Sequence, residues 1–398
     1  MKILGIESSC DETAAAVVED GHRLLSNVVA SSMDLHVQYG GVVPEIAARS
    51  HIEVILPVIA EALEAAGCTW DDIDGIAVTY GAGLSGSLLI GVMTARTLAI
   101  THNKPLYAIN HVEAHVYANF LLEATFDISS ADTKRPADKT SNVATLPPTP
   151  QTSATTSASL PEGRFVSSGE GAEVVPLRSG QPEFPMLAII VSGGHSQLAL
   201  FQDHFDYELL GQTQDDAIGE AFDKVAKVLG LPYPGGPSVA KAALKGDPRA
   251  YKLPKAKMGK YDFSFSGLKT AVLRLAQAQI GERYDFPSFK LAERLSEAQK
   301  ADIAASFQQV AIETIVDKAL LAFEEYSPKS VVIAGGVAAS PELRRQLSER
   351  LPLPVEYPDM KLCTDNGAMV ATLGCFKAMR EQPAADPYTL AIQPNLSM

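Results

Sequence analysis

The stretch that decides the fold is KILGIESSCDETAAAVV, residues 2–18. Its two apolar runs, at residues 2–8 and 13–18, flank a polar turn, and this pattern is typical of two antiparallel strands. The same arrangement of strand, polar turn and strand returns in MLAIIVSGGHSQLALF, residues 186–201. Two segments of this kind in one chain predict a duplicated fold, in which two lobes hold a ligand in a cleft between them.

The rest of the chain alternates between strand and helix patterns, which indicates the α/β class. Helical periodicity at residues 43–66 ends at Gly67, and a strand at 73–79 leads through a glycine-rich turn into a helix. The further predicted strands are residues 22–30, 105–109, 330–333 and 354–357, and the further predicted helices begin at His111, Asp216, Pro341 and Asn366.

Composition limits the classes of function. The chain has 398 residues and a net charge of -14, which speaks against general coating of nucleic acid and against a polybasic membrane anchor. One local basic run could still contact phosphates, although such runs are more often solvated loops; it consists of Lys252, Lys255, Lys257 and Lys260. The four cysteines form no CxxC pair, so they favour a reducing cytosol. No signal peptide and no membrane span are predicted.

The predicted organisation has three parts. Residues 1–117 form an N-terminal α/β lobe, residues 118–184 hold a helix end and an insertion, and residues 185–398 form a C-terminal α/β lobe. We expect the last helix to pack back on the N-terminal lobe. Residues 124–183 are rich in Ser, Thr, Pro and Ala, and this composition predicts disorder.

The segment His111-Val112-Glu113-Ala114-His115 carries a candidate metal site. Residues four apart share one helix face, so His111 and His115 can reach one ion, although two ordinary helix histidines have the same spacing. A zinc peptidase needs glutamate directly after the first histidine, and Val112 stands there. Asp365 is the best candidate for a third ligand, and its alternative role is a helix N-cap. These donors suit iron and zinc almost equally.

Three glycine-containing turns follow predicted strands and favour a nucleotide site. They are Ser192-Gly193-Gly194-His195, Gly335-Gly336 and residues 81–87. Glycines let backbone N–H groups approach anionic oxygens closely, and a helix N-terminus favours phosphate. None of the three matches the P-loop or the GxGxxG pattern.

Acidic residues supply candidates for proton transfer and ribose binding. Asp11 and Glu12 lie in the first polar turn, where they could act as a base, order a cation, or simply be solvated. Asp215, Asp216 and Glu220 head the helix predicted from Asp216, where acids suit the helix dipole. Asp223 lies further along that helix and could reach a ribose hydroxyl.

A series of motifs in this order resembles the bacterial tRNA adenosine threonylcarbamoyltransferases, the TsaD family, formerly described as O-sialoglycoprotein endopeptidases. The motifs are ESSCDETA, GGVVPEIAARSH, SGSLLIG, NHVEAH, VSGGHSQL, GEAFDKVAK, YPGGP, FSFSGLKTA, AGGV and CTDNGAM. The resemblance covers nearly the whole chain apart from residues 124–183. It implies the two-lobed fold shared by actin, sugar kinases and heat-shock chaperone ATPases.

The resemblance also implies a set of site residues. His111, His115 and Asp365 would bind one Fe²⁺ ion per subunit. The residues implied to bind the threonylcarbamoyl-adenylate substrate are Ile190, Val191, Ser192, Gly193, Gly194, Asp223, Gly236 and Ser340. The family usually has Asn at the position of Ser340 and Pro at the position of Ala82, so both places depart from its pattern.

The implied reaction transfers the threonylcarbamoyl group to the exocyclic amine of the adenosine beside the anticodon, in tRNAs that read codons starting with A. The metal would act as a Lewis acid, the glycine-turn amides would stabilise the phosphate leaving group, and Asp11 or Glu12 would accept the proton. Implied partners are tRNA, an inactive paralogue, a small ATPase and the enzyme that makes the adenylate, all in the cytoplasm. A homodimer of the isolated chain stays open.

Two alternatives remain at the level of sequence. One is a small-molecule carbamoyltransferase or kinase with the same fold. The other is a catalytically silent scaffold like the family's paralogue, against which the retained His111, His115 and Asp365 argue.

Overall fold

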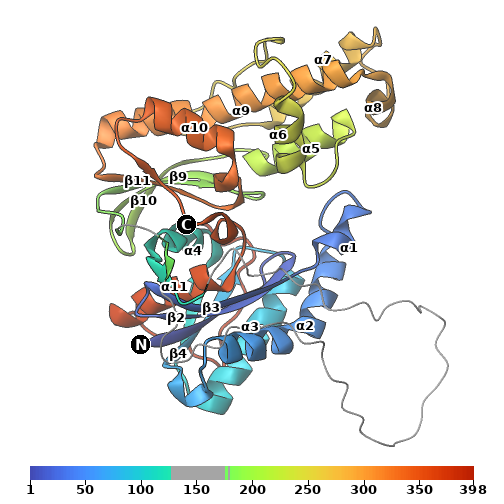
Figure 1. The fold of residues 1–398 in the computed structure, drawn as a ribbon. Helices are drawn as coiled ribbons and strands as arrows, with labels where there is room; N and C mark the ends of the chain where they lie inside the picture. The colour runs from blue at the N-terminus through green and yellow to red at the C-terminus, as the bar shows by residue number, and fades with distance from the viewer. Residues whose placement is uncertain (127–174, 178–179) are drawn as a thin grey trace, which may run out of the picture.

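Two β-sheets with helices packed on them make up the protein (Figure 1). The structure is a computed structural model that describes residues 1–126, 175–177 and 180–398. The first sheet has the strand order β5-β4-β1-β2-β3-β6-β7, and the second has the order β10-β9-β8-β11-β12. The predicted α/β class with two lobes is therefore confirmed.

The N-terminal sheet carries helices on both faces. Helices α2 and α3 pack on one face and against each other, while α4 and α11 contact the strands as well. The elements of this half are β1 (Lys2–Glu7), β2 (Glu12–Glu19), β3 (Arg23–Ser31), α1 (Met33–Val37), α2 (Pro44–Ala65), β4 (Gly75–Gly81), α3 (Ser85–His102), β5 (Leu106–Asn110), α4 (His111–Tyr117), β6 (Glu123–Ala124), β7 (Val175–Pro176) and α11 (Gly367–Met379).

The C-terminal sheet is covered by a group of helices around the long α9. Its elements are β8 (Met186–Val191), β9 (Ser196–Asp203), β10 (Asp206–Gln212), α5 (Ile218–Leu229), α6 (Gly235–Ala243), α7 (Ser266–Gln279), α8 (Leu291–Arg294), α9 (Glu297–Tyr326), β11 (Ser330–Ala334), α10 (Pro341–Arg350) and β12 (Val355–Glu356). Across the described parts of the chain, no helix combines the length and the apolarity that a bilayer crossing requires.

The repeated strand–turn–strand arrangement exists in both sheets. β1 pairs antiparallel with β2, and β8 pairs antiparallel with β9. Some predicted bounds are wrong: the helix expected from Asp216 begins at Ile218, and a 3-10 helix, Gly336–Ala339, separates β11 from α10. The helix starts later because the backbone carbonyl of Asp216 accepts a hydrogen bond from the hydroxyl of Thr213, and its carboxylate accepts one from Lys224.

Most of the predicted insertion, residues 127–174 and 178–179, lies outside the described residues. Its two edges belong to the first sheet. β6 pairs in parallel with β3, and β7 pairs antiparallel with β6. Ordered structure therefore continues past Ala124 on one side and is present again at Val175.

Helix α4 lies between the two sheets (Figure 1). It contacts β4 and β5 of the first sheet and β8 and β11 of the second, and all seven of its residues are buried. One apolar core cluster accordingly contains side chains from both sheets, including Ile3, Ala188 and Val332, together with Val112 of α4. A residue on α4 is thus held by both halves of the molecule.

Helix α11 packs so closely on the first sheet that three glycines are required at the contact. A Cβ at Gly5 would lie 2.4 Å from the backbone nitrogen of Ala371, and one at Gly367 would lie 2.6 Å from the carbonyl carbon of Ala15. A Cβ at Gly374 would lie 2.5 Å from the Cβ of Ala77. Only glycine at these three positions allows α11 to come this near to the strands.

We predict that Gly374→Ala lowers the free energy of unfolding by about 1–3 kcal/mol, because the added methyl group must push α11 away from β4. Urea denaturation monitored by circular dichroism measures the change. Gly267→Ala on α7 is the matched control, since no described atom outside its immediate surroundings lies within 4 Å of the Cβ that it would add. Equal stabilities of the Gly374→Ala variant and the wild type would contradict the close packing.

Candidate functional site

The side chains of His111, His115 and Asp365 converge at the start of α4. The Asn110 side chain caps this helix by accepting hydrogen bonds from the backbone nitrogens of Val112 and Glu113, so that His111 is its first residue. His115 lies one turn later on the same face, with ring centroids 4.7 Å apart. One ligand atom from each histidine and from Asp365 lie within 4.8 Å of one another.

The chemistry of this cluster fits a divalent transition-metal ion. The Nε2 atoms of His115 and His111 lie 3.2 and 3.6 Å from Asp365 Oδ1. Both ring nitrogens of His115 are buried; Nε2 faces only the carboxylate of Asp365, and Nδ1 has no hydrogen-bond partner among the described residues. A buried ring nitrogen without a partner is costly unless something else binds the imidazole. Two imidazoles and a carboxylate are ligands that iron and zinc accept.

The N-cap alternative for Asp365 is excluded by the geometry. The N-cap of α11 is Asn366, whose side chain accepts the hydrogen bond from the backbone nitrogen of Met369. The carboxylate of Asp365 is therefore not used for capping and faces the two histidines instead.

Glu7 is a site residue that the sequence reasoning missed. Its fully buried carboxylate lies at the end of β1, where Oε2 is 3.2 Å from His111 Nδ1. The backbone nitrogen of Ser9 and the hydroxyl of Thr79 donate to the same carboxylate. Because Nδ1 of His111 faces Glu7, its Nε2 is left to face Asp365, as in the carboxylate–histidine arrangements that orient metal ligands. The sequence signal was an acid at the end of an otherwise apolar strand.

Electrostatics in the cluster favour a protonated histidine when no metal is bound. Burial alone would lower the pKa of His111, but the carboxylates of Asp365 and Glu7 outweigh it and raise the pKa to about 9. Burial would raise the pKa of Asp365, yet the two histidines hold it well below its usual range. A metal ion would take the place of this proton, because a ligating histidine must be neutral.

The turn between β8 and β9 faces this cluster from the other sheet. The ring of His195 lies 6.3 Å from the ring of His111, and burial together with the charges of His111 and His115 lowers its pKa to about 4. The turn is closed by two hydrogen bonds between Ser192 and His195. The Ser192–His195 turn therefore lies next to the metal cluster, although 84 residues of sequence separate His195 from His111.

Asp11 and Glu12 lie at the β1–β2 turn, near the same cluster. Burial raises the pKa of Glu12 well above its usual value, and the nearby carboxylates of Asp11 and Asp365 raise it further. The backbone of the turn is fixed from outside, since Cys10 O accepts from Ser87 Oγ and Asp11 O accepts from Ser32. Asp11 is 8% exposed and Glu12 is half-buried, so the two acids are not solvated turn residues.

Of the residues expected to bind the adenylate, some could contact it only through backbone groups and others through their side chains. Ile190 and Val191 are fully buried in β8 and point into the two cores, so only their backbone can reach a ligand. Gly193 and Gly194 are exposed, and no described atom lies within 4 Å of the Cβ that either would carry. Ser192 accepts from the backbone nitrogen of Gly219, which connects this turn to the start of α5.

The remaining adenylate candidates lie on the helices beside that turn. One oxygen of Asp223 on α5 accepts from the backbone nitrogen of Gly235, which leaves the other oxygen for a ligand. Gly236 is open at the start of α6. Ser340 is the N-cap of α10, so its oxygen already accepts from Leu343, while its hydroxyl hydrogen can still be donated.

Several residues that the sequence predicted to bind phosphate or to face solvent form hydrogen bonds or ion pairs within the protein instead. The amides of Gly83 and Leu84 donate to the carbonyls of Pro394 and Ser9, so this glycine turn does not offer them to a phosphate. Lys255 pairs with Glu313 and Asp317, and Lys260 pairs with Glu325. Asp215 accepts hydrogen bonds at the start of α7 from Ser264, Phe265 and Ser266.

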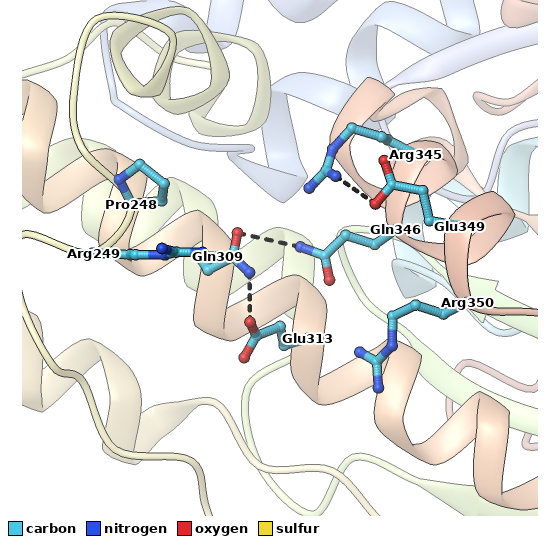
Figure 2. A pocket seen from close by; sticks show the side chains of 8 residues that line it. All are labelled: Pro248, Arg249, Gln309, Glu313, Arg345, Gln346, Glu349 and Arg350. Carbon is cyan, nitrogen blue, oxygen red and sulfur yellow. Dashed lines mark hydrogen bonds and ion pairs between the residues drawn. The ribbon is translucent and has the colours of Figure 1, made fainter.

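A cavity of about 550 Å³ lies elsewhere, between α9, α10 and the segment at Pro248 (Figure 2). It is polar, and two of its three arginines, Arg345 and Arg350, pair with Glu349 and Asp317 respectively. It contains none of the residues of the cluster described above.

The chain is similar to the known proteins of one family. Residues 23–129 and 165–372 match the model of the TsaD family, described as tRNA N6-adenosine threonylcarbamoyltransferase. A protein of that name from Thermomicrobium roseum is 45% identical over 96% of this chain and 93% of its own length. Its counterpart in Symbiobacterium thermophilum is also 45% identical, over 94% and 91%. A solved structure, component A of (R)-2-hydroxyglutaryl-CoA dehydratase from Acidaminococcus fermentans, aligns over 96% of this chain and 99% of its own with a TM-score of 0.45 and 13% identity.

We predict that the metal-free chain loses stability as the pH rises from 6.5 through 9. The raised pKa of His111 keeps a proton on the folded state that the unfolded state has already released. The free energy of unfolding should fall by at most about 1.4 kcal/mol per pH unit. Urea titrations in the presence of a chelator measure it. The His111→Gln variant should lack this fall, and a wild-type profile that matches the variant's would contradict the account.

Proposed function

The chain belongs to the TsaD family of tRNA N6-adenosine threonylcarbamoyltransferases, and on this basis we propose how its residues carry out that transfer. The donor is threonylcarbamoyl-adenylate. The acceptor is the exocyclic amine of the adenosine beside the anticodon, in tRNAs that read codons starting with A. The observation that carries the proposal is the cluster of the buried His111 and His115 with the half-buried Asp365, beside the Ser192–His195 turn, because a silent scaffold would not need to retain three converging metal ligands.

His111, His115 and Asp365 hold one Fe²⁺ ion in this proposal, and zinc would suit the same donors. When bound, the ion supplies Lewis acidity toward an oxygen of the adenylate. The protein's own contribution is orientation. Glu7 fixes the ring of His111, and the packing of α4 between the sheets fixes the spacing of both histidines.

The C-terminal sheet and its helices hold the adenylate. Gly193 and Gly194 are exposed, and their backbone amides would donate to the phosphate and stabilise the charge of the leaving group. The free oxygen of Asp223 accepts from a ribose hydroxyl, and the open backbone at Gly236 allows close approach of the nucleoside. Ser340 donates its hydroxyl hydrogen where the family usually offers an asparagine amide.

Asp11 accepts the proton that the attacking adenosine amine loses. Glu12 is the protonated member of the acid pair, since burial and the charges of Asp11 and Asp365 all favour its neutral form. Two neighbouring carboxyl groups that share one proton divide the roles of acid and base in this way.

Partner subunits complete the proposal. Helices α2 and α3 expose apolar side chains four residues apart, namely Ile52 and Leu56, and Leu89 and Met93. Exposed apolar groups on neighbouring helices are typical of protein interfaces, which supports assembly with the inactive paralogue, with the small ATPase joining that assembly. The isolated chain could use the same face for a homodimer. Four free cysteines support a cytoplasmic location, where tRNA is also found.

We predict that the wild-type chain, supplied with preformed adenylate and its partner subunits, modifies unmodified tRNA, and that Asp11→Asn lowers the transfer rate by about 10²–10⁴-fold. Asparagine keeps the shape of the side chain but cannot accept the proton. Single-turnover transfer from labelled adenylate measures the rate. Asp206→Asn, at the exposed first position of strand β10, is the control. Undiminished transfer by Asp11→Asn would remove Asp11 from this role, and a wild type that leaves tRNA unmodified would contradict the proposed function.

A further inference from the structure

The segment after α11, residues 384–398, crosses the N-terminal lobe and reaches the metal helix. We call it the C-terminal strap. Its start pairs with the edge strand β5, where Ala385 donates to the carbonyl of Leu106, and its middle pairs with β4, where Gln393 donates to the carbonyl of Tyr80. Its last residues lie beside α4, where the C mark stands in Figure 1.

Arg96 on α3 fastens the middle of the strap. Its guanidinium donates to three strap carbonyls, those of Pro387, Tyr388 and Leu390. A planar guanidinium offers five N–H donors in a fixed arrangement, so it can hold consecutive carbonyls in one conformation. Sheet-edge pairing and Arg96 together fix the path of the backbone up to the last residues.

The far end of the strap holds the N-cap of the metal helix. Asn110 donates from Nδ2 to the carbonyl of Ser397 at 3.0 Å, while its Oδ1 accepts from the first turn of α4. The orientation of the Asn110 amide therefore depends on the strap on one side and determines the helix start on the other. His111, the first helical residue, follows directly.

A second connection leads from the strap to the same histidine. The backbone nitrogen of Gly83 donates to the carbonyl of Pro394, and a Cβ at Gly83 would lie 2.6 Å from the carbonyl oxygen of Ser9. The hydroxyl of Ser9 in turn lies 3.1 Å from His111 Nδ1. The turn at Gly83 therefore lies between the strap and Ser9, and Ser9 contacts the ring of His111.

We propose that the C-terminal strap is a positioning device for the metal ligand His111, with Asn110 and Arg96 as its positioning residues. The inference rests on the metal site of the proposed function. If the strap only covered the edge of the sheet, its loss would lower stability and leave metal affinity unchanged. Partners that orient a metal ligand typically change affinity by about 10–100-fold when they are altered.

The test measures the Kd of the full chain for Zn²⁺ at pH 7 by competition with a chromophoric chelator, alongside melting temperatures. Asn110→Asp keeps an oxygen for the N-cap and loses only the donor to Ser397. The negative charge that this substitution adds would by itself strengthen the binding of a cation. Weaker Zn²⁺ binding would therefore result from the lost hydrogen bond to Ser397. Arg96→Met releases the strap at a distance from the ligands. Arg274→Met is the matched control, since Arg274 also donates to a backbone carbonyl, that of Tyr284 on the other lobe.

We expect Asn110→Asp and Arg96→Met each to raise the Kd about tenfold or more, and Arg274→Met to leave it unchanged. Kd values within twofold of wild type for both strap variants would overturn the inference while leaving the metal site intact. An equal rise in the Kd for Arg274→Met would overturn it too, because a general loss of stability would then explain the weaker metal binding. A wild type that binds no Zn²⁺ at one per chain would contradict the metal site itself.

Discussion

The buried ion pair between Glu7 Oε2 and His111 Nδ1 joins the first strand to the helix on which the site is built. Both groups are nearly free of water, so their interaction is strong, and each would be costly to bury alone. Glu7 is further held by Ser9 and Thr79, which fixes the carboxylate from two directions. The orientation of the His111 ring, and hence the ligand atom that it presents, follows from this contact.

The same helix makes the two halves of the molecule depend on each other. α4 packs between the sheets in a core to which both contribute, and α11 brings Asp365 to it from the end of the C-terminal half. The glycine turn of β8–β9 approaches from the opposite side, with His195 beside His111. In the proposed function, a metal held here would border the phosphate of the adenylate that the turn would bind.

Local patterns allowed much of this to be predicted from the sequence. The alternation of apolar and polar runs predicts both strand–turn–strand units, and the spacing of four predicts that His111 and His115 share a face. Contacts between distant residues could not be predicted. Glu7 meets His111 across 104 residues, and Asn110 meets Ser397 across 287. Likewise, nothing in Cys363-Thr364-Asp365-Asn366 shows that Asn366 caps the helix and leaves Asp365 free.

The most direct measurement of the central claim is metal-dependent transfer by the reconstituted chain. Chelated protein would be reloaded with one equivalent of Fe²⁺ and tested for transfer from preformed adenylate to tRNA, together with His115→Ala. The account predicts that activity returns in proportion to bound metal in the wild type, and that the variant neither retains the ion nor regains activity. Full transfer by the metal-free wild type, or by His115→Ala, would contradict it.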